Sequence, residues 1–271
     1  MRLTECQHNF FTAFGYLHIP ALLTPDETAV VIEEFELTIQ GISGKQHDGS
    51  KRTMIGAPIE HRPKLCALLD NPGVIGLLGG VLGEDFNYCS GDGNYYTGDT
   101  RWHPDGNWGQ LIAAKLAFYL DPLTKDSGAL RVIPGTQRPD HWVRKDGVDP
   151  NNSQELYGIH PKDFPSSIVL ETNPGDAVVF NHDLYHSSFG GSTRRRMFTL
   201  NCTRHCTKPD DLVVLKKYLS IHSAGAGKVR TGAGMFYPTM LDTAGPERLR
   251  HLQQAVEIHD ELFPELARGK S

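Results

Sequence analysis

The chain has 271 residues, a formal net charge of −5, and 39% hydrophobic and 22% charged residues. This composition is typical of a globular protein with a substantial core. It excludes a basic nucleic-acid-binding surface and an apolar run of about 18 residues that would span a membrane. The five cysteines show no paired spacing and the first residues lack a secretory signal, so we expect a soluble cytoplasmic protein.

The N-terminal part is expected to be a helical support. Residues 10–23 are predicted to form a short strand or an extended lead-in. The sequence Thr24-Pro25-Asp26-Glu27 then forms a capping box with proline at the first helical position, so a helix begins there. Its apolar face carries Val31, Phe35 and Ile39. Glu33 and Glu34 are expected to face away from the core.

The next segments alternate between loop and helix. Residues 40–60 are polar and rich in glycine, and we expect a loop near a substrate. Helices are predicted from Arg62 to Leu69 and from about Val74 to Leu82.

From residue 86 the sequence indicates short strands separated by turns. We predict strands near residues 86–97, 111–120, 129–134, 167–171, 177–182 and 195–203. Many short strands with glycine and proline turns favour a sandwich or jelly roll, so the fold class is mostly β with flanking helices.

The domain organisation follows from these elements. We predict a single domain over residues 1–271, with helical support over about 1–85, a β core over about 86–205 and a C-terminal helix over about 244–268. Residues 140–165 are a polar insertion within the core. A homodimer is a further expectation.

The five residues Arg101–Asp105, RWHPD, are the main candidate for chemistry. His103 and Asp105 are two residues apart, so on an extended strand both side chains point to one face and can bind one metal ion. Two histidines and one carboxylate leave open positions on an octahedral Fe(II), the arrangement of non-haem iron oxygenases. We predict His186 as the second histidine, on another strand.

The sequence offers two other candidate metal sites. His182 and His186 in HDLYH are four residues apart and would share a face of a helix, as in zinc hydrolases. That motif needs glutamate where this chain has Asp183, and the preceding PGDAVVF predicts a strand. The cluster Cys202–His205–Cys206 lacks the second pair that a structural zinc site requires.

Three ordered motifs extend the argument beyond a single tripeptide. They are RWHPDGNW, GALRVIPGTQRP (128–139) and NPGDAVVFNHDLYHSSFGGSTRRRMFTLN (173–201). Together with the N-terminal FGYLHIPALLTPDE, they resemble the phytanoyl-CoA dioxygenase family. The resemblance implies a double-stranded β-helix (jelly-roll, cupin-like) core that uses Fe(II), 2-oxoglutarate and O2. It also implies that His103, Asp105 and His186 are the catalytic iron ligands.

The resemblance further implies an arginine for the far carboxylate of 2-oxoglutarate, which a planar guanidinium binds with two parallel hydrogen bonds. Arg194, Arg195 and Arg196 are all candidates; the strand that follows selects Arg195, with Arg196 in reserve. Ser188 resembles the family's hydroxyl donor to this carboxylate, and Asn94 is a weaker candidate.

The function implied is oxidation, most simply hydroxylation, of a C–H bond of a small-molecule substrate, with release of succinate and CO2. We expect the loop 40–60 and the insertion 140–165 to close over the substrate, with Trp142 and Tyr157 on the insertion. One or two singly placed cations near His103 could pair with a carboxylate or phosphonate of a small metabolite, and most are expected to be solvated: Arg101, Lys115, Arg131, Arg204 and Lys208. The alternative is a catalytically silent β-barrel that binds a small molecule.

Overall fold

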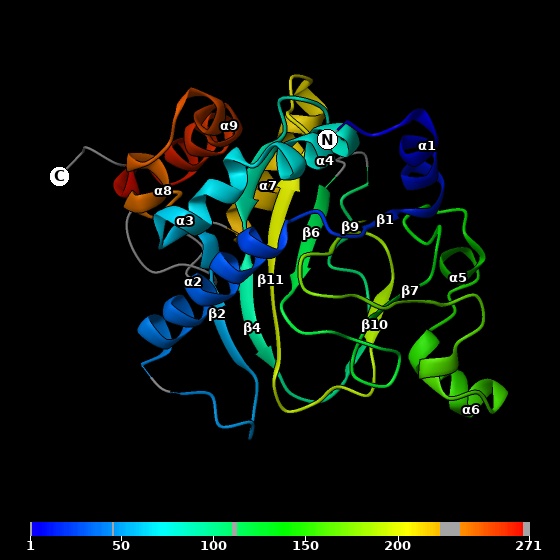
Figure 1. Cartoon of the computed structure of the whole chain (residues 1–271). Helices are drawn as coiled ribbons and strands as arrows, with labels where there is room; N and C mark the ends of the chain where they lie inside the picture. Colours follow the sequence, from blue (N-terminus) through cyan, green and yellow to red (C-terminus); the bar gives the residue numbers. More distant parts are fainter. Residues whose placement is uncertain (1, 45, 110–112, 223–233, 268–271) are drawn as a thin grey trace.

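The computed structural model describes residues 2–44, 46–109, 113–222 and 234–267. Two antiparallel sheets pack against each other, and most of the long helices cover the larger sheet (Figure 1). The larger sheet has the order β1-β9-β6-β11-β4-β2, with β3 also pairing with β11, and the smaller has the order β5-β10-β7-β8. This is the predicted mostly-β, jelly-roll-like class with flanking helices, and the sheets do not form a closed barrel.

The strands come from most of the chain. The larger sheet consists of β1 (Tyr16–Ile19), β2 (Thr53–Gly56), β3 (Asn87–Ser90), β4 (Asp92–Tyr96), β6 (Ala113–Tyr119), β9 (Ala177–Asn181) and β11 (Arg195–Thr203). The smaller consists of β5 (Thr100–His103), β7 (Leu130–Val132), β8 (Ile168–Leu170) and β10 (His186–Ser188). The strand predicted at 195–203 is confirmed as β11. Of the strand predicted at 111–120, residues 111 and 112 lie outside the described residues.

The helices flank the sheets. The α-helices are α1 (Glu5–Phe14), α2 (Pro25–Ser43), α3 (Pro63–Cys66), α4 (Pro72–Leu82), α5 (Trp142–Lys145), α6 (Ser153–Tyr157), α7 (Pro209–His222), α8 (Pro238–Asp242) and α9 (Pro246–Leu262). Short 3-10 turns lie at Pro58–Glu60, Ala67–Asp70, Pro150–Asn152, Pro161–Asp163 and Pro264–Leu266. The C-terminal helix predicted at about 244–268 is confirmed as α9 (Pro246–Leu262). Residue 268 lies outside the described residues.

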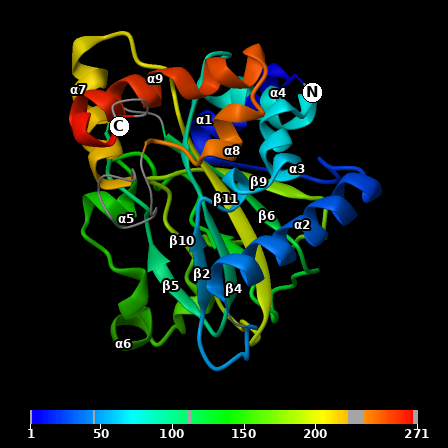
Figure 2. The ribbon, with the colours of Figure 1, turned by 90° about the vertical axis from the view of Figure 1, so that its left-hand side faces the viewer.

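The predicted capping box begins α2. The Thr24 hydroxyl accepts a hydrogen bond from the Glu27 backbone N–H, and the Glu27 carboxylate accepts one of 2.8 Å from the Thr24 N–H. These bonds satisfy backbone donors that a helix otherwise leaves unpaired. From this start α2 runs past β2 and β4 on the outer side of the larger sheet (Figure 2).

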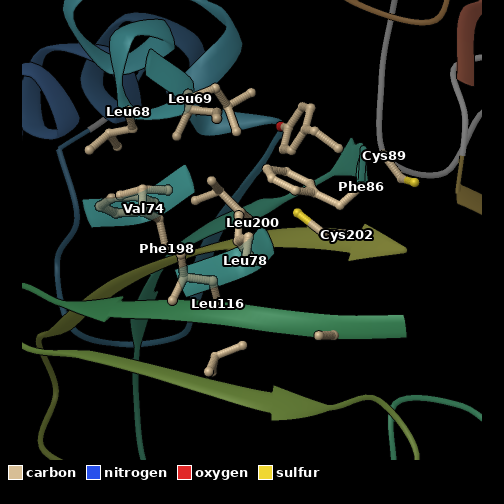
Figure 3. Close-up of a cluster of buried hydrophobic side chains, with 14 of the residues drawn as sticks. Leu68, Leu69, Val74, Leu78, Phe86, Cys89, Leu116, Phe198, Leu200 and Cys202 are labelled. Carbon is tan, nitrogen blue, oxygen red and sulfur yellow. The ribbon is translucent and has the colours of Figure 1, made fainter. Parts of the chain in front are cut away.

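The main hydrophobic core lies between the larger sheet and the helices. Leu116 of β6 and Phe198 and Leu200 of β11 meet Val74 and Leu78 of α4, and all five side chains are fully buried (Figure 3). Each such side chain contributes about 1.5–3 kcal/mol by leaving water. Because side chains alternate along a strand, the residues between them on β6 and β11 point into the space between the two sheets.

Four sequence predictions about local structure are wrong. Residues 10–23 are not one extended segment, because residues 10–14 belong to α1. This helix begins with a capping box between Thr4 and Gln7 and ends at Gly15, whose φ is +83°. The predicted strand 86–97 is two strands. It breaks at Gly91, whose backbone lies so close to the Thr199 carbonyl that a Cβ would clash.

The other two errors concern the support region and Glu34. The predicted loop 40–60 contains β2, and β1 also pairs within the larger sheet, so the support region contributes strands to the core. Glu34 is buried rather than solvated, because Arg62 and Lys64 pair with its carboxylate, Lys64 at 3.1 Å. Helices α7 and α8 were not predicted at all.

Among the described residues, no single helix is long and apolar enough to cross a membrane. One bent pair, Pro63–Asp70 with Pro72–Leu82, reaches the required length and composition.

Candidate metal centre and co-substrate cavity

The structure brings His103, Asp105 and His186 together. His103 is the last residue of β5, and the pairing of β10 with β5 places His186 directly opposite it. Asp105 follows the strand, where its backbone N–H donates a 2.8 Å hydrogen bond to the His182 carbonyl. One ligand atom from each of the three side chains lies within 4.8 Å of the others.

The chemistry of this set suits a metal ion. His103 Nδ1 lies 2.7 Å from the Arg101 carbonyl and His186 Nδ1 lies 3.0 Å from the Leu184 carbonyl. A ring that donates from Nδ1 keeps the Nε2 lone pair free for a metal. Burial lowers the pKa of His186 to about 4, so this imidazole is neutral near pH 7. Two imidazoles and one carboxylate with open positions beside them fit Fe(II).

Lys115, one of the singly placed cations of the sequence, lies at the site and lines the cavity beside Asp105. It lies on β6, its side chain is 14% exposed, and its Nζ lies 2.8 Å from Asp105 Oδ2. Burial acts to raise the pKa of Asp105 and to lower that of Lys115. The attraction between the two charges outweighs this, so the pKa of the aspartate falls and that of the lysine rises. A lone lysine in the apolar run LIAAKLAFYL was the signal that could have identified it.

A cavity of about 70 Å³ lies beside the three ligands, between the sheets. Arg195, at the start of β11, lies at this cavity and is 3% exposed. Its Nη1 donates to the Gly128 carbonyl at 2.6 Å and to the Ser188 hydroxyl. Its Nε has no hydrogen-bond partner among the described residues. Further lining comes from Tyr96, Thr100, Tyr119, Leu130, Phe180 and Met197.

The strand register separates the three arginines. Arg196 points the opposite way from Arg195, out of the cavity, where it pairs with Asp121 and, at 2.8 Å, with Glu36. Arg194 is exposed and its guanidinium lies 3.7 Å from the Glu36 carboxylate. Arg195 is therefore the arginine of this group that reaches the cavity.

Asn94 is not brought to the cavity. Its amide oxygen accepts a 2.7 Å hydrogen bond from Arg52, and its amide nitrogen donates to Asp92. The Asp92 carboxylate, in turn, lies on the cavity wall. Asn94 thus binds Arg52 and Asp92, which line the cavities, and does not line a cavity itself.

A second cavity of about 270 Å³ shares five lining residues with the first, among them His103, Asp105 and Lys115. Its wall is largely polar and includes Arg52, Ser90, Asn201 and His222. His182 also lines it and is 2% exposed, and neither ring nitrogen has a hydrogen-bond partner in the described part of the chain. Burial lowers the pKa of His182 to about 3, so its ring is neutral.

The alternative metal sites do not form. His182 lies in the turn between β9 and β10, so the helical pairing of His182 with His186 is wrong. The Cys202–His205–Cys206 cluster does not join a metal-ligand group among the residues described here. Cys202 is instead part of the hydrophobic core on β11. Burial there raises the pKa of its thiol.

The polar insertion 140–165 does not reach either cavity in the structure. Trp142 is 41% exposed and stacks on Phe164, and Tyr157 is 55% exposed. His141 and His160 each accept a backbone hydrogen bond at the start of a short helix or turn. By contrast, Arg52 and Met54 of the predicted loop 40–60 do line the second cavity.

One family model matches part of the chain. Residues 81–198 match the family model described as Phytanoyl-CoA dioxygenase (PhyH). Comparison with curated protein sequences finds no match.

Solved structures share the fold at low sequence identity. The non-heme alpha ketoglutarate dependent carbocyclase SnoK from nogalamycin biosynthesis aligns with a TM-score of 0.60 and 17% identity, covering 74% of this chain and 84% of that one. EctD from S. alaskensis with bound Fe gives 0.57 and 20%, covering 74% and 77%. HygX from Streptomyces hygroscopicus, with nickel and 2-oxoglutarate bound, gives 0.60 and 14%, covering 75% and 88%.

The matched residues 81–198 include His103, Asp105, Lys115, His186 and Arg195, so the family match covers the site described above. Residues 81–198 of the chain thus match the phytanoyl-CoA dioxygenase family model, and the chain shares its fold with solved non-heme alpha ketoglutarate dependent enzymes.

Proposed function

We propose that His103, Asp105 and His186 bind Fe(II), and that the reaction hydroxylates a C–H bond of a small molecule. Bound iron would activate O2 while 2-oxoglutarate is converted to succinate and CO2. The observation that carries this proposal is the set of three ligand atoms within 4.8 Å of one another, next to the cavity that Arg195 lines.

Arg195 is the proposed anchor for 2-oxoglutarate. Its guanidinium is buried and forms no ion pair with an acidic side chain in the described part of the chain. A buried charge without a counterion is costly, so an anion is expected beside it. The far carboxylate of 2-oxoglutarate supplies that charge, and the Ser188 hydroxyl lies beside the guanidinium as a second donor.

We infer that the second cavity holds the substrate, since it opens on the same three residues, His103, Asp105 and Lys115. Its neutral His182 can donate one hydrogen bond and accept another, and the Asn201 amide oxygen has no partner among the described residues. Such a wall favours a small polar molecule over the long apolar chain of a fatty acyl thioester. The EctD structure with 2-oxoglutarate and 5-hydroxyectoine shows that a related fold accommodates a small polar molecule.

Hydroxylation is the finer part of the proposal. Structures with this fold include a carbocyclase and an epimerase, so the ligand set alone does not determine the outcome. Asp105 supports hydroxylation over chlorination, because a carboxylate on the metal occupies the position that a chloride ion would need.

The test measures succinate release with Fe(II), 2-oxoglutarate and a panel of polar metabolites, acyl thioesters included. We expect a polar metabolite to stimulate release at least about tenfold over the uncoupled rate, with a product 16 mass units heavier, as hydroxyl insertion requires. Stimulation only by an acyl thioester would overturn the substrate class. Anaerobic 2-oxoglutarate binding without any turnover would favour the catalytically silent binding protein.

A further inference from the structure

Lys115 is a buried charge in the middle of an apolar strand. Its neighbours Ala114 and Leu116 belong to the hydrophobic core under the helices, so the lysine side chain points into the space between the sheets. There it lines both the cavity beside Arg195 and the second cavity. A lysine in such a place requires a partner, because an isolated buried ammonium is unfavourable.

The partner is one oxygen of Asp105. The Lys115 Nζ lies 2.8 Å from Asp105 Oδ2, which also lies 3.6 Å from His186 Nε2, while Asp105 Oδ1 lies 4.0 Å from His103 Nε2. Within the described residues, this is the ion pair that the structure shows for Lys115. The two oxygens of the same carboxylate therefore have different surroundings.

We propose that Lys115 is a positioning residue that makes Asp105 bind the metal through a single oxygen. This inference rests on the proposed function, since it requires a metal at His103, Asp105 and His186. Carboxylates bind cations through either one oxygen or both. A cation bound to both oxygens would lie against the ammonium beside Oδ2, and the repulsion between the two positive charges favours binding through Oδ1 alone.

The number of bound carboxylate oxygens matters for the reaction. In an octahedral site, two imidazoles and one carboxylate oxygen would leave three positions for the co-substrates, and 2-oxoglutarate would use two of them. A second oxygen from Asp105 would fill the remaining position. Lys115 thus keeps that position open for a co-substrate.

The experiment compares Lys115→Met with the parent by water-proton relaxation of the Mn(II)-loaded protein. With one carboxylate oxygen bound, Mn(II) retains three waters. With two bound it retains two, so we expect the inner-sphere relaxation to fall by about a third in the variant. With Fe(II), we expect kcat to fall about tenfold to a hundredfold while the KM for 2-oxoglutarate is unchanged. Lys115→Arg should keep most of the inner-sphere relaxation and most of the kcat of the parent.

Controls separate this role from others. Lys162→Met makes the same change at an exposed lysine that lines neither cavity, and it should change neither relaxation nor kcat. Unchanged relaxation in a Lys115→Met protein that binds Mn(II) would overturn the inference. The inference would also be overturned if Lys115→Met only raised the KM for substrate, or only lowered the unfolding temperature. If Lys115→Met does not fold, Lys115→Ala with added ethylammonium replaces it. The added amine should return relaxation toward the parent value, and unchanged relaxation without it contradicts the proposal.

The failure of the proposed function can be recognised separately. His186→Ala should weaken Mn(II) binding by at least about tenfold, because it removes a ligand. If His186→Ala binds Mn(II) as tightly as the parent does, the metal is elsewhere and both proposals fall. If His186→Ala loses the metal while Lys115→Met keeps all its waters, only the inference about Lys115 falls.

Discussion

Replacing Arg195 by alanine should weaken 2-oxoglutarate binding far more than metal binding. The guanidinium is 3% exposed, and its Nη1 is already used by the Gly128 carbonyl and the Ser188 hydroxyl. The edge with the unpartnered Nε remains for a carboxylate. Two hydrogen bonds to a charged group contribute about 1.5 kcal/mol or more each, so we expect a loss of at least about 3 kcal/mol, or about a hundredfold in affinity.

The assay is the dependence of succinate release on 2-oxoglutarate, together with anaerobic titration of the Fe(II)-loaded protein. The KM and Kd for 2-oxoglutarate should both rise about a hundredfold in Arg195→Ala, with the Fe(II) affinity within about threefold of the parent.

Arg196→Ala is the matched control. It removes a neighbouring arginine on the same strand that points away from the cavity and pairs with Glu36 and Asp121. We expect it to lower the unfolding temperature and to leave the KM for 2-oxoglutarate within about threefold of the parent. An increase in the KM for 2-oxoglutarate in Arg196→Ala, with none in Arg195→Ala, would show that Arg196 and not Arg195 faces the cavity.

Three further predictions follow from the same structure. Asp105→Ala should abolish Fe(II)-dependent turnover while far-UV circular dichroism stays that of the parent; succinate release at the parent's rate would contradict the ligand assignment. Gly128→Ala should lower stability by about 1–2 kcal/mol, because φ there is +94°. It should also raise the KM for 2-oxoglutarate, because the new methyl group would meet the Arg195 side chain; an unchanged KM argues against this contact. In Glu34, the hydrogen bond from Arg62 lowers the pKa against the opposing effect of burial, so its stabilisation is present above the unfolded-state pKa and is lost as the pH falls through the folded one. Glu34→Gln should therefore be less stable than the parent by about 1–2 kcal/mol at pH 7 and about equal to it in strong acid, as thermal unfolding across pH would show; an equal deficit at both would count against the ion pair.

The sequence determined much of this protein because the relevant signals are local. The capping box at Thr24 begins α2, and the apolar alternation of residues 195–203 defines β11. His103 and Asp105 are two residues apart, so the chain itself keeps both side chains at the same end of β5. These features depend on backbone periodicity and short-range hydrogen bonds, which neighbouring residues dictate.

Only the tertiary structure decided which distant groups meet. The pairing of β10 with β5 brings His186 to His103, and that of β11 with β4 and β6 turns Arg195 inward and Arg196 outward. The apolar run around Lys115 indicates a buried lysine, but only the packing of β6 beside Asp105 decides which group it pairs with. Asn94, a weaker candidate, and the insertion 140–165, a candidate lid, do not line either cavity in the described structure. Such outcomes depend on strand order and register, which long-range packing determines and no local pattern encodes.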